Sequence, residues 1–409
     1  MRRSTKLLFA IALFGTLACN DSAGPTTGGG DVAIGGLFSL TGNWSTLGKA
    51  SKAALELAVD DINQYLSTSG SGLHFTSDIV DTKLDPATAL TAARSLRSRG
   101  VRIAIGPQSS AEVAQIKAFA DSAGLVNASQ SSTAGSLAIA DDNIIRFTPG
   151  DSLEAIALAG LMKADGISNV VPIWRADAGN RGLASATRAR MTALGATVAT
   201  GLEYSATATS FTAELATLKT QVQAAIAASG TTKVAVMLAA FDEAVDIFKA
   251  AASDPVLSSV KWYGTDGTAL STALQTDAAA AAFAAKVGFP TPTFGLSDAI
   301  ADKWQPIAAR IKTKSGQDPD AFALAVYDAA WLAAYAYLAA GTDANAQSLR
   351  THMITAASSY YGATGWTALN AAGDRRNGDF DYFALTLVNG AYQWKRVAQY
   401  DTQTGTLTR

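Results

Sequence analysis

The sequence predicts an α/β protein made of two lobes, each a doubly wound parallel sheet covered by helices. Three observations lead to this prediction. Short apolar strands alternate with Ala-rich amphipathic helices from Val32 onward, which is the pattern of βαβ units. The alternation forms two series that are separated near Pro149. A chain of 409 residues is also long enough for two or three domains, each with its own core.

The first series contains clear helix-start signals. Asp85 and Pro86 suit the N-cap and the first turn of a helix. Ser109 and Glu112 have the spacing of a capping box that opens the next helix. The strands of this series are expected at residues 32–38, 73–80, 101–105 and 125–128, with a helix from about residue 48 between the first two.

The second series repeats the alternation after Pro149. Asp151 and Glu154 are expected to be helix-start charges, and so are Asp242 and Glu243 further along the chain. Helices are expected at residues 151–164, 182–194, 211–228 and 278–285, with a further helix that ends at residue 252, and strands are expected at 170–174, 196–204, 233–239 and 260–264.

Composition favours a binding protein over an enzyme or a nucleic-acid-binding protein. The 32 Lys and Arg balance 34 Asp and Glu, whereas nucleic-acid binding needs a basic face. A single Cys excludes a disulfide framework, and His74 and His352 are too few for a metal cluster or a catalytic triad. Ser258 and Lys261 match the S-x-x-K pattern, but Lys261 enters a predicted strand where that pattern requires a helix. We therefore expect no enzymatic activity, no metal and no cofactor.

The N-terminus has the pattern of an export signal. Three basic residues precede an apolar run at residues 7–18, which would span about 18 Å as a helix and is too short to cross a bilayer. Cys19 follows directly, and the sequence before it resembles a bacterial lipobox. Residues 1–18 are therefore expected to be a lipoprotein signal peptide, with Cys19 as the lipidated residue. Residues 19–31 lack bulky apolar side chains and are expected to be a flexible tether.

Polar loops follow most of the predicted strands. In open parallel sheets such loops lie at the carboxyl ends of the strands, where ligands bind. Helix N-termini at this edge favour an anion such as a carboxylate. The loops are expected at residues 39–48, 106–110, 129–133, 176–182, 240–242 and 265–268.

Seven sequence motifs, in order along the chain, resemble type 1 periplasmic binding proteins of the branched-chain amino acid receptor family. They lie at residues 34–63, 106–113, 129–133, 144–151, 262–267, 327–337 and 389–401. The resemblance implies two lobes joined by a three-segment hinge, with crossovers near Gly150, residues 288–290 and residues 380–382. The first lobe would comprise residues 32–150 plus 290–380. The second would comprise residues 151–289 plus 381–409.

The resemblance also implies a set of ligand-binding residues. Ser110, Ser131 and Thr133 occupy positions where the family grips the carboxylate of an amino acid. Asp266 matches the acidic residue that binds the ammonium group, and Phe241 lies where an aromatic side chain walls the cleft. Each also has a purely structural interpretation, since the serines and Thr133 suit ordinary caps and turns and Asp266 suits a turn.

Two further residues are candidates at the same site. Ser109 is the better N-cap of the pair Ser109 and Ser110, which leaves Ser110 freer for a ligand. Trp44 could form a wall of the cleft or lie on the surface of its lobe.

The resemblance implies an exported, lipid-anchored solute-binding protein, expected to be a monomer, that faces the periplasm or the cell exterior. It would close around an amino acid or a similar small carboxylate and deliver it to the membrane subunits of an ABC permease. The alternative is a lipoprotein that uses the same fold as an amide sensor or as an activator of a cell-wall synthase, without transport.

Overall fold

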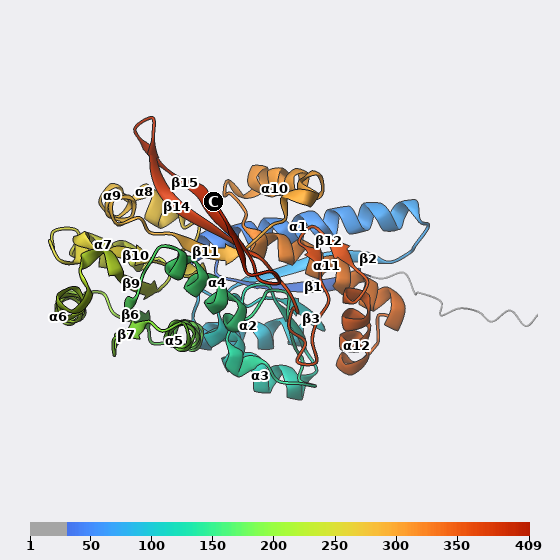
Figure 1. Ribbon diagram of the computed structural model, residues 1–409. Coiled ribbons are helices and arrows are strands. Elements are labelled where there is room, and N and C mark those ends of the chain that lie inside the picture. Colours follow the sequence, from blue (N-terminus) through green and yellow to red (C-terminus); the bar gives the residue numbers. More distant parts are fainter. Residues whose placement is uncertain (1–30) are drawn as a thin grey trace, which may run out of the picture.

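The structure is a computed structural model that describes residues 31–409, and its first five strands form one parallel sheet (Figure 1). The sheet order is β2-β1-β3-β4-β5, so the order reverses between β1 and β3. In an open α/β sheet, a crevice for a ligand forms beyond the carboxyl ends of the strands at such a reversal. The strands are β1 (Asp31–Phe38), β2 (His74–Asp81), β3 (Ile103–Ile105), β4 (Val126–Ser129) and β5 (Ile144–Arg146).

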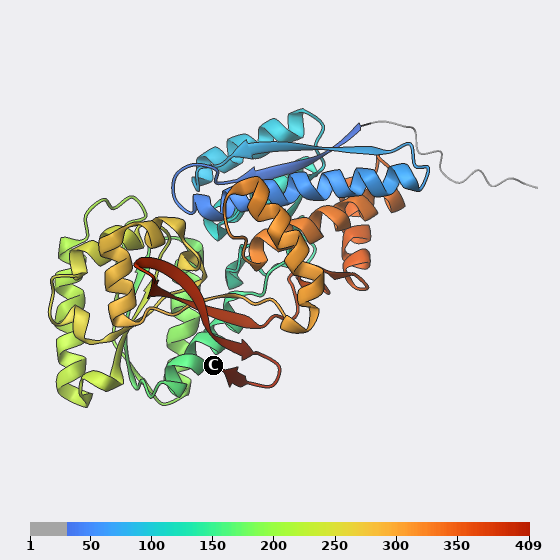
Figure 2. The ribbon, with the colours of Figure 1, turned by 90° about the horizontal axis from the view of Figure 1, so that it is seen from above.

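Helices cover both faces of this sheet. The helices α2 (Pro86–Ser98) and α3 (Ser110–Ala123) bury Ala and Leu side chains against one face. On the other face lie α1 (Ser45–Thr68) and α11 (Ala321–Ala340), which pack against each other. The chain therefore completes its first lobe with a segment far from the N-terminus. Figure 2 shows the orange α10 (Ala301–Ser315) of this late segment beside the blue α1, and α12 (Ala346–Ala357) packs against α11.

The helix α11 is apolar on all sides. Among residues 31–409 it alone is long and apolar enough to cross a membrane, but 83% of its most apolar stretch is buried in the protein. The carboxylate of its Asp328 accepts hydrogen bonds from the backbone N–H groups of Ala363 and Thr364, at 2.7 and 2.9 Å. A helix that is hydrophobic all round is typical of a protein core, and α11 fills the core of the first lobe.

The second lobe contains another parallel sheet, in the order β10-β9-β6-β7, with β8 also paired to β6. Its strands are β6 (Asn169–Arg175), β7 (Thr197–Val198), β8 (Leu202–Tyr204), β9 (Val234–Ala239) and β10 (Lys261–Tyr263). Its helices are α4 (Asp151–Ala164), α5 (Ala178–Ala193), α6 (Thr212–Ser229), α7 (Ala244–Ala251), α8 (Thr272–Thr276) and α9 (Ala278–Val287). Short 3-10 turns occur at Gly135–Leu137, Thr231–Lys233, Leu257–Ser259, Asp266–Thr268 and Asp298–Ile300.

A four-stranded antiparallel sheet runs between the two lobes, where Figure 2 shows its long red strands. Phe294 of this sheet packs in the core of the first lobe, whereas Phe380 and Leu385 pack in cores of the second. Asn389 and Gly390 join the two long strands with φ of 50° and 82°, as a tight hairpin turn requires. The strands are β11 (Thr291–Phe294), β14 (Phe380–Val388), β15 (Ala391–Asp401) and β16 (Thr406–Thr408), and a small separate hairpin consists of β12 (Tyr361–Gly362) and β13 (Gly365–Trp366).

The predicted class, two parallel-sheet lobes with a hinge that the chain crosses three times, is confirmed by this topology. Two element predictions were wrong. Helix α5 begins at Ala178 instead of residue 182, because the Asp177 carboxylate caps the N–H of Asn180 at 2.9 Å. The single strand predicted over residues 196–204 is two strands, since Gly201 adopts a φ of 71° between them. The lobe boundaries at residues 150, 289 and 380 stay predictions, and Cys19 and the signal peptide lie outside the described residues.

Candidate functional site

A small cavity lies between the lobes, beyond the carboxyl ends of their parallel strands. Ten residues line it, and they include all seven that the sequence analysis proposes for ligand binding. The structure thus brings these side chains together, and their roles toward a ligand stay predictions. The lining residues are Trp44, Ser109, Ser110, Ser131, Thr133, Gly179, Asn180, Leu183, Phe241 and Asp266.

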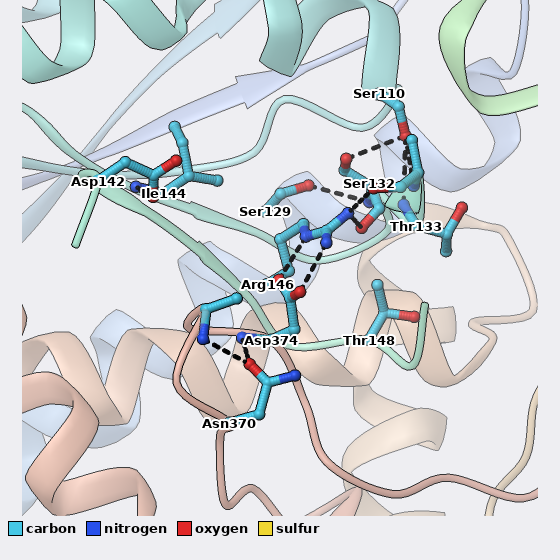
Figure 3. Close-up of polar contacts among 12 residues, drawn as sticks. Ser110, Ser129, Ser132, Thr133, Asp142, Ile144, Arg146, Thr148, Asn370 and Asp374 are labelled. Atoms are coloured by element: carbon cyan, nitrogen blue, oxygen red, sulfur yellow. Dashed lines mark hydrogen bonds and ion pairs between the residues drawn. The ribbon is translucent and has the colours of Figure 1, made fainter. Parts of the chain in front are cut away.

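The wall on the first lobe is a serine-rich turn tied to the start of α3. Ser110 Oγ accepts hydrogen bonds from the backbone N–H groups of Thr133 and Ala134, at 3.2 and 3.1 Å. It also lies 3.0 Å from Ser132 Oγ. Ser131 Oγ donates to the carbonyl of Gln108 at 3.0 Å. Figure 3 shows Ser110 and the turn with Ser132 and Thr133 facing each other. The turn, referred to below as the serine turn (residues 131–134), is therefore fixed in place before any ligand contact.

A buried arginine supports the serine turn from behind (Figure 3). Arg146 donates through Nη1 to the carbonyl of Ala134 at 2.7 Å. Its Nε and Nη2 bind the two carboxylate oxygens of Asp374, at 2.6 and 2.7 Å. The side chains of Arg146 and Asp374 are only 2% and 9% exposed, so the pair is a bidentate buried ion pair. It connects the serine turn to a segment that lies 228 residues later.

Ser109 has the structural role that its capping box predicts. Its Oγ accepts the N–H of Glu112 at 3.3 Å, and its own N–H donates to the Glu112 carboxylate at 3.0 Å. Burial raises the pKa of Glu112, which is held inside the protein by these bonds. Ser109 lines the cavity while its hydroxyl serves the helix, so Ser110 has the more direct access to a ligand.

The wall on the second lobe is acidic. Asp266 follows β10, and its backbone N–H donates to Glu154 Oε1 at 3.1 Å, while its Oδ1 accepts from Gly267 N at 2.8 Å. Burial, and then the charge of Asp151, raise the pKa of Asp266 to about 8. Burial also raises the pKa of Asp151 to about 6. The pKa of Glu154 is raised well above its ordinary value, by burial and then by the charges of Asp266 and Asp151.

The two walls touch each other around Trp44. Its backbone N–H donates to Asp242 Oδ2 at 2.7 Å, and Asn43 Nδ2 donates to Glu243 Oε2 at 2.6 Å. Burial would raise the pKa of Glu243, but the guanidinium of Arg175 and hydrogen bonds, including that from Asn43, bring it below its ordinary value. The lobes therefore meet across the cleft through hydrogen bonds from the loop after β1 to Asp242 and Glu243.

The sequence matches the family model described as the receptor family ligand binding region over residues 50–387, which is most of the chain. The chain belongs to this receptor family. A protein of Methanocaldococcus jannaschii, named "Uncharacterized protein MJ1266", is 27% identical over 396 residues, covering 91% of this chain and 90% of that protein.

Solved structures similar to this receptor-family chain are ABC transporter substrate-binding proteins. One from Desulfitobacterium hafniense, in complex with Leu, has a TM-score of 0.68 and 20% identity over 90% of this chain and 100% of the other. The leucine binding protein LivK of Thermotoga maritima has a TM-score of 0.69 and 19% identity over 89% and 97%. A solute binding protein of R. palustris in complex with benzoate has a TM-score of 0.70 and 20% identity over 90% and 96%. The chain thus has the predicted fold of type 1 periplasmic binding proteins.

Several residues of this site were not predicted from the sequence. Gly179, Asn180 and Leu183 line the cavity because α5 begins earlier than predicted. Asp151 and Glu154 are first-turn residues of α4, as expected, but they also lie behind Asp266. Asp242 and Glu243 likewise precede α7 and bind the loop of the opposite lobe, so they are more than helix-start charges. Acidic residues at a helix start look the same in the sequence whether or not they make such contacts, so no sequence signal reveals this second role.

Proposed function

We propose that this chain is an extracytoplasmic solute-binding lipoprotein of an ABC importer. Its lobes would close on an amino acid or a related small carboxylate, and the closed form would deliver the ligand to the membrane subunits of the permease. The observation that carries this proposal is the convergence of loops from six parallel strands of two lobes on one cavity.

The polarity of the cavity supports an amino-acid ligand. The serine turn and the N-terminus of α3 offer hydroxyls and the positive end of a helix dipole, which suit a carboxylate. Asp266 lies on the opposite wall and suits an ammonium group. Because a closed cleft excludes water, both charged groups of the ligand need partners inside it. Trp44 and Phe241 supply the apolar part of the wall.

Binding is tested by thermal unfolding of the mature chain with a panel of amino acids, aromatic acids and amides. A ligand present at one hundred times its dissociation constant stabilises the folded state by about 2.7 kcal/mol, which raises the melting temperature measurably. A saturable shift with at least one amino acid or aromatic acid is the expected result. If no compound shifts the melting temperature, the transport proposal fails and the alternative of an interaction module gains support.

The lipid anchor is part of the same proposal. Cys19 follows a basic segment and a short apolar run, and a polar tether separates it from the first strand. A tether of twelve such residues has a root-mean-square reach of about 20 Å, so the lobes would remain near the membrane that holds the permease.

A further inference from the structure

Three buried carboxylates lie together behind the cleft without a cation. Asp151 and Glu154 belong to the first turn of α4 and are only 3% and 1% exposed, and Asp266 lines the cavity in front of them. Within residues 31–409, no basic side chain comes within ion-pair distance of these three. Arg146 and Arg175, which lie beside the cleft, already have their own carboxylate partners in Asp374 and in Asp177 and Glu243.

Asp151 is the member of this group that itself indicates a ligand. Among the described residues no hydrogen bond of good geometry reaches either of its carboxylate oxygens. Burial raises its pKa to about 6 and outweighs the Thr133 hydroxyl, the charge of Arg146 and the Gly135 N–H, which lower the pKa, as expected for a carboxylate that is incompletely partnered. Its backbone N–H binds the carbonyl of Thr133, and its Oδ2 lies where a Cβ on Gly182 would come within 2.6 Å. The carboxylate therefore lies between the serine turn and the first turns of α5, the two segments that supply half of the cavity lining.

The hydroxyls of the serine turn already take part in hydrogen bonds within the protein. Ser110 Oγ already accepts two N–H groups, and the Ser131 hydroxyl already donates to a carbonyl. The acidic wall, in contrast, has unused acceptors. A zwitterion with one ammonium group would neutralise only one of the three carboxylates, and the others would stay buried without a cation.

We propose that the ligand is an organic cation with two positively charged nitrogens, as in a basic amino acid or an α,ω-diamine. One nitrogen binds Asp266, which lines the cavity, and the second binds the Asp151 and Glu154 pair, which lies directly behind Asp266. Trp44 and Phe241 also line the cavity, and aromatic rings attract cations to their faces. This inference rests on the proposed solute-binding function: a basic amino acid specifies its substrate class, whereas a diamine would keep the solute binding without the carboxylate.

The test compares three molecules with the same carbon skeleton by calorimetry on the mature protein. Norleucine is lysine without the side-chain ammonium group, and cadaverine is lysine without the carboxylate. Lysine is expected to bind at least tenfold more tightly than norleucine. Cadaverine tests whether the carboxylate of the ligand is also bound. It should bind as tightly as lysine if only the two cations are recognised, and more weakly if the serine turn holds the carboxylate of lysine.

The outcomes distinguish this inference from the proposed function. If norleucine or leucine binds as tightly as lysine, and cadaverine does not bind, the dication inference is overturned and the solute-binding proposal stands. If no amino acid, diamine or aromatic acid binds, both are overturned. Glu154→Gln should bring the lysine-to-norleucine affinity ratio down toward one, and its melting temperature reports whether it folds. The comparison on the parent protein needs no variant, so a misfolded variant leaves the test intact.

Discussion

The ring centres of Trp44 and Phe241 lie 4.7 Å apart, with 31° between the ring planes, although the two residues come from opposite lobes. Trp44 also has a φ of 58°, in the left-handed region. Such a backbone costs a bulky residue roughly 1–2 kcal/mol, and here it coincides with the hydrogen bond from Trp44 to Asp242 across the cleft. The loop after β1 is therefore shaped by its contact with the other lobe.

Trp44→Ala should lower the affinity for the ligand that stabilises the parent protein by at least tenfold, because it removes one aromatic wall. Ten-fold in affinity corresponds to about 1.4 kcal/mol. Calorimetry on the purified variant measures this change. Trp366→Ala is the matched control, since that side chain is 60% exposed on a separate hairpin. Equal affinities of the two variants would contradict a role of Trp44 in the cleft.

Asp266→Ala should reduce affinity for an amine-bearing ligand by about 2–5 kcal/mol, since the buried ammonium group loses its partner. Asp246→Ala, which removes a surface carboxylate that is 60% exposed, should leave affinity unchanged. Titration calorimetry with the same ligand compares the variants. An Asp266 variant that binds amines as tightly as the parent would remove the assignment.

Affinity for lysine should rise between pH 5 and pH 8. Burial raises the pKa of Asp266 to about 8 and that of Asp151 to about 6, so protons occupy the acidic wall at low pH. Asp177 and Asp320 also raise the pKa of Asp266, while both ammonium groups of lysine stay charged near pH 7. A cation favours the ionised carboxylates, and binding therefore releases protons. Calorimetry in two buffers of different ionisation enthalpy counts them, and pH-independent affinity without proton release would refute the prediction.

Arg146→Ala should lower the free energy of unfolding by about 3–5 kcal/mol, because it leaves Asp374 buried without its partner. Arg99 and Asp78 form an ion pair of similar geometry whose side chains are 45% and 29% exposed. Arg99→Ala should therefore cost no more than about 1 kcal/mol. Urea unfolding of both variants gives the comparison, and equal losses would show that burial of the Arg146 pair is not what matters.

Cys19→Ala should move the protein from the membrane fraction to the soluble exported fraction, because the proposed anchor residue is lost. Ser22→Ala, three residues along the tether, should leave it with the membrane. Fractionation followed by immunoblotting measures both. A Cys19 variant that stays with the membrane would argue against lipidation at this position.

The alternation of strands and helices sufficed to predict both parallel sheets, because buried parallel strands read as short apolar runs between amphipathic helices. Parallel strands also put the residues that follow them at one edge, which explains why Ser110 and Asp266 converge although 156 residues separate them. The antiparallel strands β14 and β15 were not predicted. They form a hairpin across Asn389 and Gly390, and this Asn-Gly pair is the local signal that could have found them.

The contacts of the acidic wall could not be predicted from the sequence either, for a different reason. The contact between Glu154 and Asp266 joins residues 112 positions apart, and a first-turn Glu looks the same whether or not an acid faces it. The start of α5 was misplaced because Asp177 caps the helix earlier than Gly182 suggested.

The pairing of Arg146 with Asp374 also determines when the binding site can exist during synthesis. At synthesis rates of about 5–20 residues per second, the ribosome makes the second partner roughly 10–50 s after the first. Until then the serine turn lacks its support, and the first sheet lacks α10, α11 and α12 on one face. A nascent chain of this protein would therefore stay incompletely folded until almost its full length has been made.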